Sequence, residues 1–308
     1  MADKPTLKIG HLLITDHLVL GATKVKLAKG AETFEHCQIQ TIAMTGWNSI
    51  GEALEGGEID VAFILAPYAM EMFHSGNPIK LVLFAHKDGS IIVANKRANI
   101  KTIADFKGKT ILIPYHQSVH HMLIDKLLTE NGLETGVGKD VVFETVAPSQ
   151  IPQAIEWDED GDIGGYIVAE PWGSQVINAG LGEQIALSSE IWPNHPCCVV
   201  VAREEIVQKY PEAVQELTTS LVKSGKLLEE KKDTAIKIGA SFLNQDIEVM
   251  KMVLDAPVQK VSTRNLLPVL DELETMQDYL TSKVSAMSGK IDLEKFVDMQ
   301  FAKNAGAE

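Results

Sequence analysis

Residues 110–128 are Thr-Ile-Leu-Ile-Pro-Tyr-His-Gln-Ser-Val-His-His-Met-Leu-Ile-Asp-Lys-Leu-Leu, a segment that combines strand, turn and helix signals. Ile111 to Ile113 predict a short buried strand, and residues 114–117 predict a turn. Ser118 can then cap a helix whose apolar residues keep helical spacing through Leu128. Because a helix N-terminus exposes free N–H groups and carries partial positive charge, this start can bind a small anion or polar ligand.

Three histidines, His116, His120 and His121, crowd the start of that helix. Their spacing suits a metal ion only if all three lie on one helix face, and His116 is expected to precede the helix. No nearby Asp, Glu or Cys completes a ligand set. We therefore predict no metal here and expect His120 or His121 to hydrogen-bond a ligand directly. The alternative is a helix that simply carries surface histidines.

The composition is that of a globular protein with an acidic surface. The chain has 308 residues, of which 45% are hydrophobic and 23% charged, and its net charge is −14. This charge argues against nucleic acid as a partner, because phosphate binding needs a basic surface. The first residues lack the apolar core of a signal peptide, so we expect either a cytoplasmic protein or one whose leader was removed. The odd cysteine count predicts no disulfide framework.

Strand and helix signals alternate along most of the chain. Apolar runs predict strands at residues 7–13, 38–43, 59–65, 81–85, 91–94, 141–146, 163–169 and 197–201. Asp16 is a candidate N-cap for the helix that follows the first strand, and Pro67 takes the favoured first position of another helix. From Glu204 onward the pattern is almost entirely helical. The alternation predicts an α/β fold with parallel sheets.

An internal similarity between two segments indicates two similar lobes. Gly57 to Pro67 and Gly161 to Pro171 have the same length, and each comprises a Gly-acid-Ile start, a strand and a closing proline. The match is too weak for a repeat protein. It fits two α/β units, each of which points a strand end and a helix start at the space between them, where ligands bind in open α/β sheets.

Several single residues allow two interpretations. Trp47 either stacks on a ligand or covers the core. Glu170 is either a buried acceptor for a ligand or one partner of a salt bridge between the lobes. His195 precedes a buried strand, where it can face the cleft. Cys197 and Cys198 are expected to point to opposite faces of that strand as two small buried hydrophobes.

Taken together, these motifs resemble a known family. The chain is similar to substrate-binding proteins of ABC importers, in the nitrate/sulfonate/taurine/bicarbonate branch that also contains the thiamine-pyrimidine synthase-like proteins. The likeness rests on the order and spacing of five segments, 14–17 (Ile-Thr-Asp-His), 57–62 (Gly-Glu-Ile-Asp-Val-Ala), 118–121 (Ser-Val-His-His), 169–172 (Ala-Glu-Pro-Trp) and 192–198 (Trp-Pro-Asn-His-Pro-Cys-Cys), and also on the helix opening at 210–214.

The resemblance implies a two-lobed type II periplasmic-binding-protein fold with a ligand cleft between the lobes. It implies one lobe from residues 1–88 with 202–308 and a second from residues 89–201, with crossings near 87–91 and 199–202. By analogy, the ligand-binding residues are Thr15, His17, Trp47, Ala66, Pro67, Ser90, Gln117, Ser118, His120, Glu170 and His195. Trp47 and His120 match the positions that contact the anion in the nitrate and bicarbonate members.

The implied function is capture of a small polar or anionic ligand, without catalysis, cofactor or metal. The partners would be the ABC permease subunits in the membrane, and the protein would be a monomer. Its location would be periplasmic, or that of an extracytoplasmic lipoprotein. A lysine that helps to hold nitrate is replaced near Asn194-His195, and no arginine matches a sulfonate site. The alternative is a cytoplasmic thiamine-pyrimidine synthase-like enzyme or a ligand sensor on the same fold. The short Cys197-Cys198 run disfavours the synthase chemistry.

Overall fold

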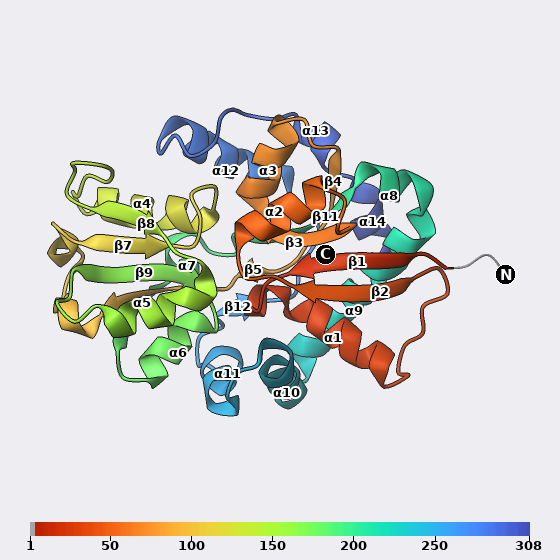
Figure 1. The fold of residues 1–308 in the computed structure, drawn as a ribbon. Coiled ribbons are helices and arrows are strands. Elements are labelled where there is room, and N and C mark those ends of the chain that lie inside the picture. The colour runs from red at the N-terminus through yellow and green to blue at the C-terminus, as the bar shows by residue number, and fades with distance from the viewer. Residues whose placement is uncertain (1–3) are drawn as a thin grey trace.

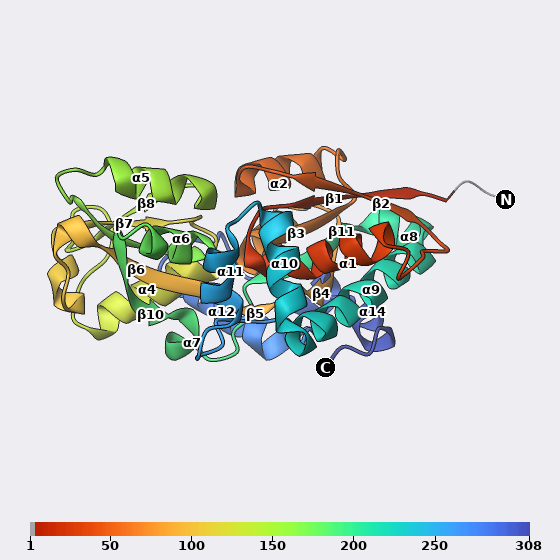
Figure 2. The same ribbon diagram turned by 90° about the horizontal axis from the view of Figure 1, so that it is seen from below.

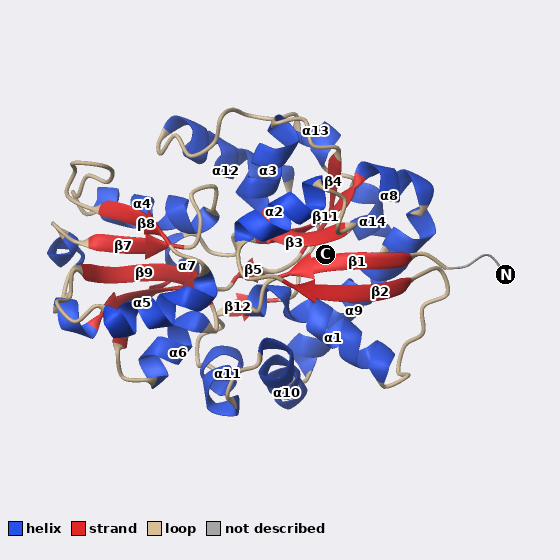
Figure 3. Ribbon diagram, in the orientation of Figure 1, coloured by secondary structure: helices blue, strands red, loops and turns tan. Residues whose placement is uncertain are grey.

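The computed structural model describes residues 4–308, and its strands form two five-stranded sheets that lie side by side (Figures 1 and 3). The first sheet, in spatial order, is β2 (Gln38–Ala43), β1 (Thr6–His11), β3 (Val61–Leu65), β11 (Cys198–Arg203) and β4 (Ile79–Phe84). The second is β10 (Gly182–Leu187), β6 (Ser90–Asn95), β9 (Ile163–Ala169), β7 (Thr110–Ile113) and β8 (Val142–Thr145). We call the first sheet and its helices the first lobe, and the second sheet and its helices the second lobe.

Helices cover both faces of each sheet, as Figure 2 shows from below. The helices of the first lobe are α1 (Leu18–Ala28), α2 (Trp47–Glu55), α3 (Ala66–His74), α8 (Glu204–Lys209), α9 (Pro211–Glu230) and α14 (Met299–Asn304). Those of the second lobe are α4 (Val119–Glu130), α5 (Ile151–Trp157), α6 (Trp172–Asn178) and α7 (Ser188–Ile191). All five residues of β3 are buried, as expected for a strand covered on both faces.

The predicted α/β class is confirmed, but the sheets are mixed rather than parallel. β1 runs parallel to β2 and β3, and β7 runs parallel to β8 and β9. β11 is antiparallel to β3 and β4, and β6 is antiparallel to β9 and β10. The apolar content of a strand reports its burial and not its direction, which here depends on where the chain crosses between the sheets.

Short pairings connect the lobes. β5 (Lys87–Asp88) pairs antiparallel with β12 (Val261–Ser262), and Lys87 also forms a bridge to Pro196. β11 pairs within the first sheet from Cys198 onward, which favours a second crossing just before Cys198 rather than inside 199–202. The lobe boundaries at 88/89 and 201/202 stay a prediction.

The C-terminal helices contact both lobes. α11 (Ile247–Leu254) packs on α6 and on α10 (Lys232–Leu243), and α12 (Leu270–Ser282) packs on α3, α4 and α13 (Leu293–Phe296). The Tyr279 hydroxyl donates to Asp125 Oδ2 at 2.8 Å, which ties α12 to the second lobe. Within residues 4–308, no helix is both long and apolar enough to cross a membrane.

Candidate ligand site between the lobes

The 3₁₀ turn η1 (Thr15–His17) is one of the places where the first lobe contacts the second. Both the backbone N–H and the hydroxyl of Thr15 donate to the carbonyl of Glu170, at 2.8 and 2.9 Å. Glu170 directly follows β9, and its own N–H donates to the carbonyl of Gly89 at 2.9 Å. The sequence-predicted residues Thr15 and Glu170 are therefore in direct contact across the two lobes.

His17 and Trp47 present two buried polar atoms from the first lobe. His17 Nδ1 lies 3.0 Å from the Leu12 N–H and 3.1 Å from the Leu12 carbonyl. If it accepts from the N–H, the proton of the neutral ring is on Nε2. The ring of Trp47, at the first position of α2, meets the His17 ring edge-on with centroids 5.9 Å apart. Within residues 4–308, neither His17 Nε2 nor Trp47 Nε1 has a hydrogen-bond partner, although both side chains are buried.

His120 presents a third buried polar atom, from the second lobe. Ser118 caps α4 as predicted, because its hydroxyl oxygen accepts from the His121 N–H at 3.1 Å. This cap places His120 in the first turn, where its Nε2 lies 2.8 Å from the Ser90 hydroxyl. If that hydroxyl donates, the ring proton is on Nδ1, which has no partner in the described part of the chain.

Two acceptors lie near the crossing strands. His195 Nδ1 donates to the Pro196 carbonyl at 3.2 Å, which leaves a lone pair on Nε2. Asp88 Oδ1 is 3.8 Å from that Nε2, and neither atom has a hydrogen-bond partner among the residues described. Since a carboxylate oxygen and an imidazole lone pair both accept, a donor group placed between them would bind both.

Burial keeps the three histidines of this region neutral. Burial lowers the pKa of His120 to about 3, with a further contribution from the nearby His195 and His86. Burial also lowers the pKa of His195 to about 3 and that of His17 well below its usual value. Burial raises the pKa of Asp88. Burial disfavours the charged form of His86 as well, but the Asp16 carboxylate beside it raises the pKa of His86 to about 10. A ligand here would therefore meet three neutral imidazoles, with a positive charge close by on His86.

Glu170 has its carboxylate occupied by the protein. Its Oε1 accepts from Lys260 Nζ at 2.7 Å and from the Ser174 hydroxyl at 2.7 Å, and its Oε2 accepts from the Ser174 N–H at 2.8 Å. Of the two sequence interpretations, this geometry favours the salt bridge over direct contact with a ligand. Lys260 lies in the C-terminal part of the chain, where no sequence pattern indicates a site residue.

The other predicted residues occupy varied places. Ala66 and Pro67 form the buried first turn of α3, and the Ala66 N–H donates to the Cys197 carbonyl at 2.9 Å. Gln117 is only half-buried in the turn before α4. His116 and His121 do not converge with His120. His116 is exposed, and His121 Nδ1 lies 3.0 Å from the backbone carbonyl of His116.

Two predictions about neighbouring residues are wrong. Asp16 does not cap α1, which begins at Leu18 with His17 as an N-cap that makes no side-chain bond. The Asp16 carboxylate instead lies 3.0 Å from His86 Nε2. Cys197 and Cys198 do not point to opposite faces, because β11 begins only at Cys198 and both thiols lie 3.7 Å from Asp16 Oδ2.

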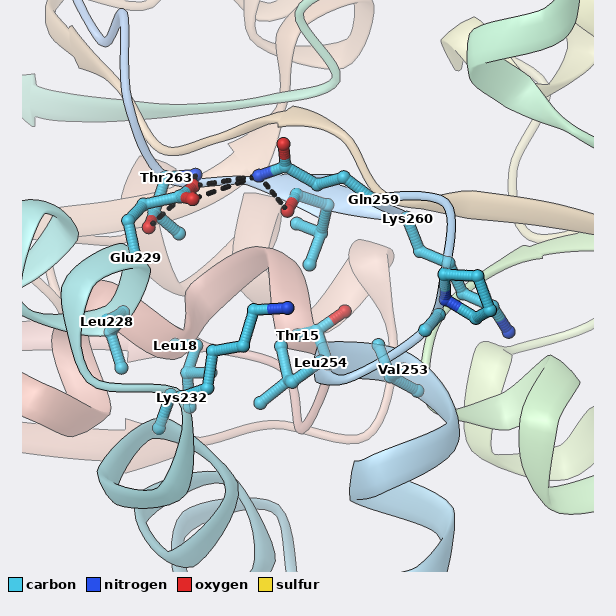
Figure 4. A pocket seen from close by; sticks show the side chains of 14 residues that line it. Thr15, Leu18, Leu228, Glu229, Lys232, Val253, Leu254, Gln259, Lys260 and Thr263 are labelled. Carbon is cyan, nitrogen blue, oxygen red and sulfur yellow. Dashed lines mark hydrogen bonds between the residues drawn. The ribbon is translucent and has the colours of Figure 1, made fainter.

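A separate cavity of about 200 Å³ is lined on one side by Thr15 of η1 (Figure 4). Its other walls come from helices α1, α9, α10 and α11 and from residues between 256 and 263. Of the predicted site residues only Thr15 lines it. Its acid, Glu229, already accepts from Gln259 Nε2 and from the Thr263 N–H. Three of its polar side chains are thus paired with one another, and Thr15 and Lys260 both bind Glu170.

The two α/β lobes, their short crossing strands and the buried polar groups between them define a type II periplasmic-binding-protein fold. Over residues 1–243 the chain matches the NMT1-like family. The protein belongs to the NMT1-like family.

Among curated proteins, the nitrate import ATP-binding protein NrtC of Synechocystis sp. is 28% identical over 237 residues. That match covers 72% of this chain but only 35% of NrtC. Two solved structures share the fold over nearly the whole chain. The ligand-binding component of an ABC-type import system from Staphylococcus aureus, with zinc bound, has a TM-score of 0.87 at 23% identity, covering 98% of this chain and 99% of its own. The nitrate-binding protein NrtA of Synechocystis has a TM-score of 0.85 at 18% identity, covering 99% and 89%.

The fold does not by itself separate binding from catalysis. The desulfurization enzyme DSZB also shares it, with a TM-score of 0.68 at 14% identity over 98% of this chain and 99% of its own. Function therefore has to be argued from the groups in the site.

Proposed function

We propose that this protein is the solute-binding component of an ABC importer and that it captures a small polar or anionic ligand between its lobes. In this proposal the closed form docks on membrane permease subunits, acts as a monomer, catalyses no reaction and works outside the cytoplasmic membrane. The names of NrtC and NrtA support the transport class. The buried polar atoms between the lobes support the place of binding.

The observation that carries the proposal is the set of unpartnered polar atoms contributed by both lobes. Trp47 Nε1 and His17 Nε2 come from the first lobe and His120 Nδ1 from the second, and within residues 4–308 all three lack a partner. A buried polar group without a hydrogen bond costs about 1–3 kcal/mol, so several together indicate a ligand or ordered water. Donors on both lobes would make closure depend on the ligand.

The same atoms favour a particular ligand chemistry. Trp47 Nε1 is a donor, and His17 Nε2 and His120 Nδ1 donate when their other ring nitrogens accept from the Leu12 N–H and the Ser90 hydroxyl. His195 Nε2 and Asp88 Oδ1 are acceptors. The best match is thus a small molecule that both accepts and donates hydrogen bonds, such as an oxyanion with a hydroxyl group or an amide. Nitrate, which has acceptors only, would leave the two acceptors unsatisfied.

Isothermal titration calorimetry with nitrate, bicarbonate, a short alkanesulfonate and a simple amide tests this proposal. We expect the tightest binding from a compound that has both donors and acceptors, with a matching rise in melting temperature and no consumption of the compound. Trp47→Phe keeps the ring but removes the N–H, and should weaken binding roughly 5- to 100-fold. Trp157→Phe, on an exposed ring, is the matched control.

Three results would count against the proposal. Chemical turnover of any compound would favour the enzyme alternative. Unchanged affinity in Trp47→Phe would exclude the interlobe donors as the site. Tight binding of nitrate with no binding of donor-bearing compounds would leave the importer function in place but refute the inferred ligand chemistry.

A further inference from the structure

Four side chains that are able to bind a metal ion converge where η1 meets the strands that leave the first sheet. They are Asp16, His86, Cys197 and Cys198, and one ligand atom from each lies within 4.8 Å of all the others. All four are buried. They come from three separate segments, namely η1, the link between β4 and β5, and the start of β11. The proposed solute site uses none of these four side chains.

The distances resemble the edges of a metal coordination tetrahedron. Asp16 Oδ2 lies 3.0 Å from His86 Nε2 and 3.7 Å from each cysteine Sγ. Ordinary zinc bond lengths place tetrahedral N and O ligands about 3.3 Å apart and O and S ligands about 3.5 Å apart. Shifts of a few tenths of an ångström would thus place one ion at bonding distance from Asp16, His86 and both thiols.

His86 Nε2 has two close polar neighbours that make opposite demands on it. The Cys198 N–H points at His86 Nε2 from 3.1 Å, which requires a lone pair on that nitrogen. Asp16 Oδ2 lies 3.0 Å from the same nitrogen, which requires a proton there. One imidazole nitrogen cannot satisfy both neighbours.

Two further atoms of the cluster lack a partner. Asp16 Oδ1 and His86 Nδ1 have no hydrogen-bond partner in the part of the chain that the structure describes. Both face Gly89, where an added Cβ would lie 2.8 Å from Asp16 Oδ1 and 3.0 Å from His86 Nδ1. The rival arrangement is an ion pair of protonated His86 with Asp16, in which both thiols donate to Asp16 Oδ2 from 3.7 Å. The test has to separate the two, because both arrangements leave the proton on His86 Nδ1 and the Asp16 Oδ1 atom without a protein partner.

We propose that Asp16, His86, Cys197 and Cys198 bind one divalent transition-metal ion, with Zn²⁺ as the best match to two sulfur, one nitrogen and one oxygen ligand. Binding releases both thiol protons and uses the neutral imidazole lone pair. Because four protein ligands fill a tetrahedron, no position stays open for a substrate. The ion would fasten η1, which carries Thr15 and His17, to the crossing segment and to β11.

The test uses the full chain purified under reducing conditions. Metal content is measured by mass spectrometry, and the protein is then unfolded in chelator and refolded with Co²⁺. We expect about one metal ion per chain and the thiolate-to-cobalt charge-transfer absorption with intense tetrahedral d–d bands. Cys197→Ser and Cys198→Ser should each remove about half of the charge-transfer intensity, and the double variant should remove all of it. Cys37→Ser, at a buried thiol outside the cluster, is the matched control and should keep the full spectrum.

The wild-type spectrum decides the question even if the variants fail to fold. A refolded wild-type protein with no charge-transfer band and no bound metal would overturn the proposal, as would full metal content in the double variant. Asp16→Asn separates the proposal from the ion pair. It should weaken cobalt affinity while keeping the thiolate band, whereas an unchanged affinity would exclude the carboxylate as a ligand.

Discussion

His120 shows how burial changes the chemistry of one residue. The sequence pattern places His120 at the helix start and predicts contact with a ligand, and that contact stays a prediction. The structure adds that the ring is fully buried, bonded to Ser90 through Nε2, and that its pKa falls to about 3. In the unfolded chain the same ring has a pKa near 6.5. Between these values the unfolded state binds a proton that the folded state does not, so His120 destabilises the fold as the pH falls.

The pH dependence of unfolding tests this effect directly. Between pH 7 and pH 5 the His120 contribution to the unfolding free energy should fall by about 2 kcal/mol, because 1.36 kcal/mol corresponds to one pH unit per proton. His120→Gln has no such proton, so its unfolding free energy should fall by that much less over the same range. Urea unfolding of both proteins at the two pH values measures the difference. Parallel losses in both would show that the folded ring titrates normally.

At the scale of elements, capping could be predicted where both partners are close in sequence. Ser118 and the His121 N–H are three residues apart, and this cap is confirmed. Asp16 had the same local signal, but its carboxylate pairs with His86 and with thiols about 180 residues away. No local pattern reports such a partner. The antiparallel entry of β11 was missed for the same reason, since strand direction depends on the crossings.

The α4 cap can be tested by removing one hydroxyl. In Ser118→Ala the His121 N–H loses its acceptor and the Tyr115 carbonyl loses the donor at 2.6 Å. We expect a loss of about 1–2 kcal/mol in the free energy of unfolding by urea. Ser282→Ala, whose exposed hydroxyl bonds only to the preceding helical turn, should change stability by less than about 0.5 kcal/mol. Equal effects of the two substitutions would contradict a capping role.

At the scale of the whole molecule, the sequence indicated two lobes but not what holds them together. The repeat of Gly57–Pro67 in Gly161–Pro171 predicted a pair of α/β units, and the two five-stranded sheets agree with it. Of the contacts between them, only Glu170 was predicted, as one of two alternatives for that residue, and its partner Lys260 could not be, because the two segments share no spacing. Lys260 O accepts from the Gly89 N–H at 2.8 Å, Gly89 O accepts from the Glu170 N–H, and Glu170 O accepts from Thr15. This series of hydrogen bonds runs through the crossing region from one lobe to the other.

The Lys260–Glu170 ion pair adds a side-chain contact to these backbone hydrogen bonds. Both side chains are buried, and Lys260 Nζ lies 2.7 Å from Glu170 Oε1. Lys260→Met would leave the Glu170 carboxylate buried without a counter-charge, so it should lower the free energy of urea unfolding by about 3–5 kcal/mol. Adding Glu170→Gln removes the stranded charge while keeping an acceptor for Ser174 and should restore a clear part of that loss. Lys139→Met, in an exposed pair with Glu134, should cause no measurable change. If the double variant were no more stable than Lys260→Met alone, the unpaired Glu170 charge would not explain the loss. The backbone hydrogen bonds of Gly89 would then be the main contact between the lobes in this region.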